Sequence, residues 1–196
     1  MYLSTDRLVV RDFTAADLDA SHALLDLDLH MDDLDREGRR RWLEWTVLDY
    51  KFRARAHQPG YGEYAVAAAD GGEVVGVVGI VPSMMPFALL PGYPTAQAAG
   101  QAFAEPAVGL FWSIGSAHQR QGYAAEAGAA VMGFCFTELG AGRVVATTEH
   151  DNAASIGVMR RLGMQVVANP GAAPFYLQVV GWRDHPGPAP EWPTQP

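Results

Sequence analysis

The segment from Gln119 to Ala124 carries the residue types that hold a phosphate group against a backbone. It has the pattern Gln-x-x-Gly-x-Ala and stands between a strand-like run and an apolar, helix-like run. Backbone amides at the start of a helix converge on an anion, and the helix dipole strengthens the attraction. Gly122 lets the backbone come close, Ala124 keeps the first turn unobstructed, and the Arg120 side chain can add a charge-assisted contact. The pattern predicts a pyrophosphate site here, although a single glycine at such a junction more often marks only a turn.

Turn residues and hydrophobic periodicity predict a mixed α/β domain around this segment. Asp70-Gly71-Gly72 indicates a hairpin, and Thr14 followed by Asp17 resembles a capping box. Helical runs between strand-like runs favour helices packed on a mixed sheet. We expect strands at residues 8–13, 63–69, 73–81, 107–115, 143–148, 165–167 and 175–182, and helices at residues 18–25, 35–55, 122–139 and 152–162.

We expect a single domain over residues 1–183. Within it, an apolar insert at residues 82–106 joins two expected strands, and its stretch from Pro82 to Ala104 has four prolines and no charged residue. The insert is too interrupted for a long helix and too apolar for a solvated loop. It therefore either covers a pocket or packs on another subunit, as in a homodimer. Residues 184–196 are rich in proline, and we expect them to form an extended or mobile tail.

Composition limits the class of protein. The formal net charge is −8, which disfavours broad binding to nucleic acid and is compatible with an amine substrate or with plain solubility. No apolar run approaches the roughly 20 residues of a membrane span, and the N-terminus lacks the pattern of a signal peptide. Cys135 is the single cysteine, and no metal-ligand spacing is present. We expect a cytoplasmic protein that binds no membrane, nucleic acid or metal.

A second motif follows further along the chain. Asn152-Ala153-Ala154-Ser155 opens another helix after another strand, and residues 160–164 end it. Together with the run from Ile114 to Ala127 and the opening from Thr5 to Arg11, this motif resembles the GNAT superfamily of acetyltransferases. The similarity is greatest to the branch that acetylates the N-termini of ribosomal proteins. It covers most of the chain apart from the insert and the tail, and it implies the GNAT fold with acetyl-CoA as acyl donor.

The resemblance also implies roles for individual residues. In the family, two parallel strands splay apart, and the pantetheine arm of CoA enters the gap and pairs with the strand that here contains residues 111–114. Asn152 corresponds to an asparagine that hydrogen-bonds pantetheine or nearby backbone, and it also suits a plain helix N-cap. Ser155 stands where some relatives place a hydroxyl near the sulfur, or it is simply a first-turn residue. The implied cofactor contacts are Trp112, Ser113, Ile114, Gln119, Arg120, Gln121, Gly122, Tyr123, Ala124, Asn152 and Ser155.

The implied reaction is direct attack by a neutral primary amine, of a small molecule or a peptide N-terminus, on the thioester carbonyl. Many relatives protonate the leaving thiolate with a tyrosine in the helix after the asparagine, but this chain has Ile156-Gly157-Val158-Met159 there. Ser155 or a bound water must then replace that acid, or the thiolate leaves unprotonated. Glu149 is the preferred candidate for the base, although a surface glutamate at a strand end is the plainer interpretation. His118, His150 and Glu105 are weaker candidates.

Other functions stay open. The missing tyrosine leaves room for a CoA-binding regulatory or scaffold protein without turnover, and the sequence also permits an enzyme that uses a larger acyl-CoA. The cluster Arg39-Arg40-Arg41 has three interpretations: contact with an acidic partner, contact with the 3′-phosphate of CoA, or a solvated helix face. We prefer the solvated face. Cys135 stands among apolar residues and is expected to be a buried, inert thiol.

Overall fold

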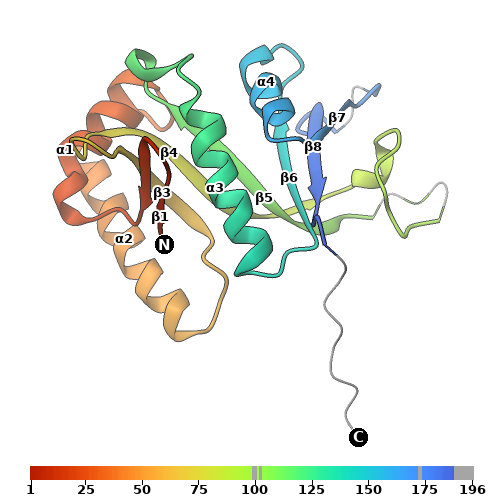
Figure 1. The fold of residues 1–196 in the computed structure, drawn as a ribbon, viewed down its shortest axis with the longest axis horizontal. Helices are drawn as coiled ribbons and strands as arrows, with labels where there is room; N and C mark the ends of the chain where they lie inside the picture. The colour runs from red at the N-terminus through yellow and green to blue at the C-terminus, as the bar shows by residue number, and fades with distance from the viewer. Residues whose placement is uncertain (99–100, 102, 172–173, 188–196) are drawn as a thin grey trace, which may run out of the picture.

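Eight strands form one mixed sheet in the part of the chain that the computed structural model describes, namely residues 1–98, 101, 103–171 and 174–187. Their spatial order is β1-β2-β3-β4-β5-β6-β8-β7, and every neighbouring pair is antiparallel except β5 and β6 (Figure 1). This arrangement confirms the expected mixed α/β class. The strands are β1 Tyr2–Ser4, β2 Leu8–Arg11, β3 Gly62–Ala68, β4 Val74–Met85, β5 Glu105–Ile114, β6 Arg143–Thr148, β7 Gln165–Ala168 and β8 Val179–Asp184.

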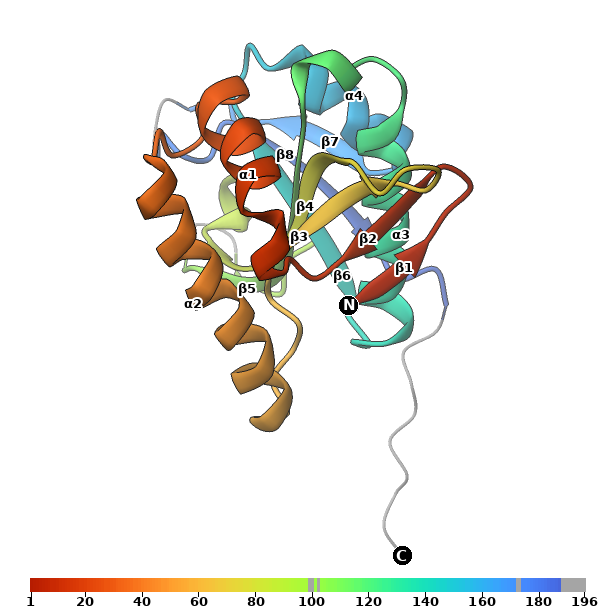
Figure 2. The same ribbon diagram turned by 90° about the vertical axis from the view of Figure 1, so that its left-hand side faces the viewer.

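Helices cover both faces of the sheet (Figures 1 and 2). On one face, α3 (Tyr123–Thr137) and α4 (Ala153–Arg161) share a core with β2 to β6. On the other face, α1 (Leu18–Ser21) and α2 (Arg36–Arg55) lie over β3 and β4, with Leu43 of α2 in the same core as Val77 of β4. The shorter helical segments are η1 Ala15–Asp17, η2 His22–Asp28, η3 Phe87–Leu89 and η4 Ser116–His118. None of the helices among the described residues combines the length and apolar character that crossing a membrane requires.

The first helical segment departs from the regular helix expected at residues 18–25. After one turn of α1 the chain continues as the π-helix η2, where the Leu29 N–H donates to the Leu24 carbonyl. The wider turn brings Asp26 beside Arg39, on a different helix. Local propensity contains no signal for a π-helix, so this part of the expectation is wrong, and tertiary contacts account for the change. The short edge strand β1 is also absent from the expected elements.

The expected insert at residues 82–106 is shorter in the structure. Strand β4 continues to Met85 and β5 begins at Glu105, because the two strands stay paired from Pro82↔Val108 to Met85↔Glu105. A proline is tolerated at position 82 because β3 pairs with β4 only as far as Ile80, so this part of β4 has lost one neighbour.

The apolar residues of this segment cover the chain's own sheet. Phe87, Leu90 and Tyr93 are buried in one cluster with Val145 of β6 and Trp182 of β8. The ring centres of Tyr93 and Trp182 are 5.1 Å apart in an edge-on contact. This packing explains the low polarity of the segment without a second subunit. Residues 99, 100 and 102 lie outside the described residues.

The last strand lies later in the chain than expected. Residues 175–178 form a turn rather than the start of a strand, closed by a hydrogen bond from the Leu177 N–H to the Pro174 carbonyl. Strand β8 then extends to Asp184, so the boundary expected at residue 183 falls inside it. Residues 188–196, most of the expected proline-rich tail, lie outside the described residues.

Candidate active site

The two parallel strands β5 and β6 separate soon after they meet. They are paired at only two positions, Val108↔Val144 and Gly109↔Val145. Beyond this point β5 remains bonded to β4 as far as Ile114, and β6 remains bonded to β8. Because each strand follows its other neighbour, an opening forms along the second half of β5 (Figure 1). Backbone groups at such an edge are free to pair with an extended ligand.

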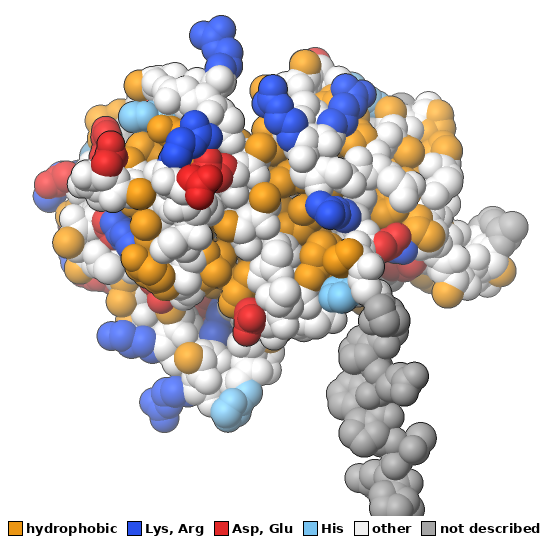
Figure 3. All heavy atoms as spheres, viewed as in Figure 1, with side chains coloured by type: hydrophobic (Ala, Val, Ile, Leu, Met, Phe, Trp, Pro, Cys, Tyr) orange, Lys and Arg blue, Asp and Glu red, His pale blue; other side chains and the backbone are white. Residues whose placement is uncertain are grey.

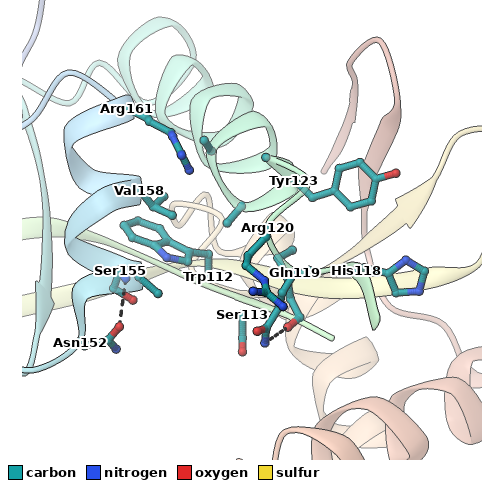
Figure 4. Close-up of a pocket in the computed structure, with 15 residues that line it drawn as sticks. Trp112, Ser113, His118, Gln119, Arg120, Tyr123, Asn152, Ser155, Val158 and Arg161 are labelled. Atoms are coloured by element: carbon teal, nitrogen blue, oxygen red, sulfur yellow. Dashed lines mark hydrogen bonds between the residues drawn. The ribbon is translucent and has the colours of Figure 1, made fainter. Parts of the chain in front are cut away.

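A cavity of about 330 Å³ lies beside this opening, on the face covered by α3 and α4 (Figure 4). Its lining comes from the end of β5, the following loop, the first turn of α3, and one side of α4 along its length. All predicted cofactor contacts except Gln121 belong to this lining. The lining residues are Trp112, Ser113, Ile114, His118, Gln119, Arg120, Gly122, Tyr123, Ala124, Ala125, Asn152, Ala154, Ser155, Val158 and Arg161.

The loop before α3 has the backbone geometry that glycine favours. Gly122 is the N-cap of α3, with φ +88° and ψ −1°, and Arg120 also adopts a left-handed φ of +60°. An added Cβ at position 122 would lie 3.4 Å from Nη2 of Arg7, and the positive φ would strain any other L-residue. Nε2 of Gln119 donates to the Ile114 carbonyl at 2.9 Å and closes the loop from inside (Figure 4). The helix therefore starts at a tight turn whose residues Gly122, Tyr123 and Ala124 line the cavity, and the first amides of a helix have no partner within it.

Arg7, in the connection between β1 and β2, secures this loop from outside. Its Nη2 donates to Oε2 of Glu126 at 2.6 Å, and its Nη1 donates to the Gln121 carbonyl at 3.1 Å. Its guanidinium carbon also lies 4.7 Å from the ring centre of Tyr123. Burial alone raises the pKa of Glu126, but hydrogen bonds from Thr5 and Arg7 lower it more, so the net pKa is below its usual range. This role of Arg7 was not predicted from the sequence, where the only signal for it was the position of Arg7 in the opening motif.

A second contact joins the loop to the helices on the opposite face. Oδ2 of Asp28, the last residue of η2, accepts the backbone N–H of Ser116 at 2.7 Å. Hydrogen bonds from Ser116 hold the pKa of Asp28 below its usual range. The chain between β5 and α3 is thus fixed at its start by Asp28 and at its end by Arg7.

Asn152 and Ser155 meet at the start of α4. Oδ1 of Asn152 accepts the backbone N–H of Ser155 at 3.0 Å, which confirms the N-cap predicted for Asn152 (Figure 4). In the same view the Trp112 indole lies against this end of α4, near Ser155 and Val158. Side chains from β5 and α4 therefore meet at this side of the cavity.

Basic side chains contribute to the lining of this cavity. Arg120 and Arg161 are part of its lining, and Figure 3 shows Lys and Arg grouped on this face, over the region of α3 and α4. Positive side chains and free helix-start amides are the groups that bind phosphates. Together with the close approach at Gly122, they fit the pyrophosphate of a CoA molecule.

A second cavity, of about 410 Å³, lies at the same opening on the opposite face of the sheet. Phe111 lines it, whereas Trp112 lines the first cavity, because successive strand residues point to opposite faces. Its lining contains no charged residue. Its only side-chain polar groups are hydroxyls of Ser83 and Thr147, and the Ser83 residue is 7% exposed. The lining residues are Val81, Pro82, Ser83, Met84, Met85, Gly109, Leu110, Phe111, Val145, Ala146 and Thr147.

The candidate bases are less central than the cofactor residues. Glu149 is exposed just beyond β6, where its carboxylate accepts the Thr148 hydroxyl at 3.2 Å, and it lines neither cavity. His118 lines the first cavity, with Nε2 3.6 Å from a Glu73 oxygen. The other two candidates are also outside both linings: the His150 N–H donates to Gln178, and the Glu105 carboxylate accepts hydrogen bonds from Thr95 and Gln97.

This geometry defines a class of protein. A mixed sheet whose parallel strands part beside a glycine-containing helix start is the arrangement expected of an acyl-CoA-dependent acyltransferase. The model of the acetyltransferase (GNAT) domain matches residues 7–165. The chain belongs to the GNAT acetyltransferase family.

Individual relatives agree with this assignment. Bacillus subtilis (strain 168) has an "uncharacterized N-acetyltransferase", YnaD, that is 33% identical over 63 residues; the match covers 32% of this chain and 37% of YnaD. Two solved structures are 18% identical and share the fold. One is a Salmonella typhimurium acetyltransferase that modifies the N-terminal serine of ribosomal protein L7/L12, with a TM-score of 0.64 and coverage of 94% and 99% of the two chains. The other is RimL, an L7/L12 α-N-acetyltransferase in complex with coenzyme A, with a TM-score of 0.63 and coverage of 94% and 98%.

Proposed function

We propose that this chain transfers the acetyl group of acetyl-CoA to a primary amine. One observation carries the proposal: two cavities lie on opposite faces of the sheet at the place where β5 and β6 part. Such a pair of cavities allows donor and acceptor to approach one opening from different sides. Holding both reactants in this way converts a bimolecular step into an effectively intramolecular one.

The donor belongs in the cavity between α3 and α4. The amides at the start of α3, with Arg120 and Arg161, would hold the phosphates, and residues 112–114 would pair with the pantetheine arm. Asn152 keeps its cap to Ser155, so its side-chain N–H₂ stays available for a ligand. When bound, acetyl-CoA supplies a thioester carbonyl that an amine can attack.

Two side chains of the protein would carry out the proton transfers of the reaction. The attacking amine must be neutral, so its ammonium form loses a proton before the C–N bond forms and the C–S bond breaks. We propose that the Glu149 carboxylate takes this proton at the end of β6, through solvent. The Ser155 hydroxyl, in the first turn of α4, is the proposed proton donor to the leaving thiolate, in place of a tyrosine.

The acceptor proposed for the second cavity is the α-amine of a peptide or protein N-terminus. Its uncharged lining with two hydroxyls suits a small first side chain and a backbone, and it offers no carboxylate for a polycation. The Salmonella protein that acts on an N-terminal serine adds weight to this choice over a free small amine.

The test is thiol release from acetyl-CoA with short peptides that begin with serine, alanine or methionine. The same peptides with blocked N-termini, together with polyamines and aminoglycosides, form the comparison set. Turnover with free N-termini alone, acetyl located on the α-amine by mass spectrometry, and loss of turnover in Gly122→Glu would support the proposal. The Gly71→Ala variant is the matched control, because an added Cβ there meets nothing within 4 Å.

Other outcomes lead to other functions. Tight CoA binding without turnover of any acceptor would favour a regulatory CoA-binding protein. Turnover with succinyl-CoA but not acetyl-CoA would favour a larger donor. Absence of CoA binding by the folded chain would refute the proposal, because the reaction requires acetyl-CoA as donor.

The proton roles need separate measurements. We expect Ser155→Ala to lower kcat by roughly 10²- to 10⁴-fold with little change in CoA affinity, the typical contribution of a general acid. Glu149→Gln should lower kcat with little change in CoA affinity, because an amide cannot accept the proton of the ammonium group. An unchanged kcat in Glu149→Gln would exclude this carboxylate as the base.

A further inference from the structure

The outward face of α2 carries apolar side chains where a surface helix normally carries polar ones. Trp45, Leu48 and Phe52 recur at helical spacing and are 59%, 64% and 71% exposed. The inward face of the same helix buries Leu43 but also the polar residues Arg39 and Thr46. A helix on the surface of a globular protein usually has the reverse arrangement. A row of large exposed apolar side chains is typical of a contact surface.

An apolar groove of about 470 Å³ runs beside this row. It lies between α2 and the start of the first helical segment, where Ala15 and Leu18 form its other wall. Leu48 belongs to both the row and the groove. We refer to the row and the groove together as the α2 surface. Figure 2 shows α2 along one side of the molecule, with no other described element over its outer face.

The charges around the α2 surface are mostly positive. Arg41, Lys51 and Arg55 are exposed, and no ion pair joins them to another of the residues that the structure describes. The acidic neighbours Glu37 and Glu44 are both paired with Arg40. The rest of the chain is acidic, since its overall net charge is −8. The α2 surface is therefore a basic and apolar region on an acidic molecule.

A second copy of the chain fits this surface poorly. A twofold pairing of two α2 helices in antiparallel orientation, centred on Leu48, would place Arg41 of one copy opposite Arg55 of the other. Like charges in contact oppose association. An acidic partner would instead meet three cations that form no ion pair with any other residue the structure describes, and Trp and Arg are among the residue types that contribute most to binding at interfaces.

We propose that the α2 surface binds an acidic, amphipathic helix of a partner protein. The stretch of α2 from Arg41 to Arg55 is about 21 Å long at 1.5 Å per residue, which matches a partner helix of about 14 residues. Apolar side chains of that helix would fill the groove beside Leu48, and its carboxylates would meet the cations at the two ends. The row faces away from the sheet, so the partner would leave both cavities accessible. The proposal does not depend on the acceptor proposed above.

The test uses the full chain and a labelled helical peptide of about 18 residues, with leucines along one face and glutamates on the other. Fluorescence anisotropy should show saturable binding that weakens as salt is added, because charge contributes to it. The double change Arg41→Glu and Arg55→Glu, and separately Leu48→Ser, should each weaken binding at least about tenfold. Phe175→Ser, which removes an equally exposed aromatic from the turn before β8, should leave binding unchanged. Circular dichroism would confirm that each variant is folded.

Four results would overturn the proposal. The first is that the acidic peptide does not bind, and the second is that a peptide with lysine in place of glutamate binds equally well. Vesicles of phosphatidylglycerol bind the chain and Leu48→Ser abolishes that binding, which would assign the surface to an anionic membrane. Sedimentation shows a dimer that Leu48→Ser separates, which would assign it to self-association.

Discussion

Arg7 and Glu126 are 119 positions apart in the chain, yet Nη2 and Oε2 of their side chains lie 2.6 Å apart beside the start of α3. The pair joins the β1–β2 connection to the helix whose first amides face the cavity. A second hydrogen bond from Arg7 reaches the backbone of Gln121 inside the loop. The edge of the sheet therefore fixes the loop that the proposed donor would contact.

We expect Arg7→Ala to weaken CoA binding roughly threefold to tenfold, about 1 kcal/mol, because the loop loses a charge-assisted hydrogen bond. The melting temperature should change little, since Arg7 is half exposed and exposed ion pairs contribute little to stability. Isothermal titration with CoA is the measurement. Arg160→Ala is the matched control, as an exposed arginine of α4 outside the cavity lining. Equal losses in the two variants would show a general charge effect instead of a fixed loop.

Two substitutions of Asn152 can separate its cap from any contact with the donor. Asn152→Ala should cost about 1 kcal/mol of stability, because the Ser155 N–H loses its acceptor. Asn152→Asp keeps a cap oxygen and should retain stability, but it removes the side-chain N–H₂ and adds negative charge beside an anionic ligand. Chemical unfolding and CoA titration measure the two effects. Unchanged CoA affinity in Asn152→Asp would leave this residue with the cap alone.

Gly79→Ala tests the second cavity without touching the first. An added Cβ would lie 2.1 Å from Cε1 of Phe111, which lines the second cavity, and 2.7 Å from the Gly62 carbonyl oxygen, so both the ring and the neighbouring strand must move. We expect a loss of roughly 1–3 kcal/mol in stability from overpacking, a higher KM for the peptide acceptor, and unchanged CoA affinity. Steady-state kinetics on both substrates provides the readout. A matching loss of CoA affinity would mean that the strain spreads across the sheet.

Asp26 predicts a dependence of stability on acid pH. Burial alone raises its pKa, but hydrogen bonds from Arg39, His22 and the Leu34 N–H lower it more, so that the pKa falls to about 2. A lowered folded-state pKa means that this stabilisation is complete above the unfolded pKa and is lost as pH falls through the folded pKa. Unfolding free energy should therefore drop by roughly 2 kcal/mol from this group between pH 5 and pH 2.

Substitution of Asp26 checks the same point. Asp26→Asn leaves the fully buried Arg39 without its main carboxylate, so we expect a loss of roughly 3–5 kcal/mol near neutral pH. Its unfolding free energy should fall less steeply with acid than that of the wild type. Asp33→Asn, which breaks an exposed pair with His30, should change neither quantity appreciably. A wild-type acid slope retained in Asp26→Asn would show that other carboxylates govern acid unfolding.

The three arginines of the predicted cluster Arg39-Arg40-Arg41 differ in burial and in ion pairing. Arg39 is buried against Asp26, Arg40 pairs with Glu37 and Glu44, and Arg41 is exposed without a partner among the described residues. The expectation of a solvated face is wrong for Arg39. Sequence spacing places successive residues on different sides of a helix, but it does not reveal which side faces a buried carboxylate from a π-helix.

Cys135 is buried as expected, and burial raises its pKa to about 12, which suits an inert thiol.

The sequence by itself determined the class of fold, the glycine at the start of α3 and the cap at Asn152. These depend on local chemistry: a positive φ favours glycine, and a side-chain oxygen is needed to satisfy a free amide. Only the tertiary structure decided the extent of the β5–β6 separation, the second cavity, the contacts of Arg7 and Asp28 with the loop, and the outward row on α2. Each of these joins groups far apart in the chain, and local propensity does not specify which distant partners will meet.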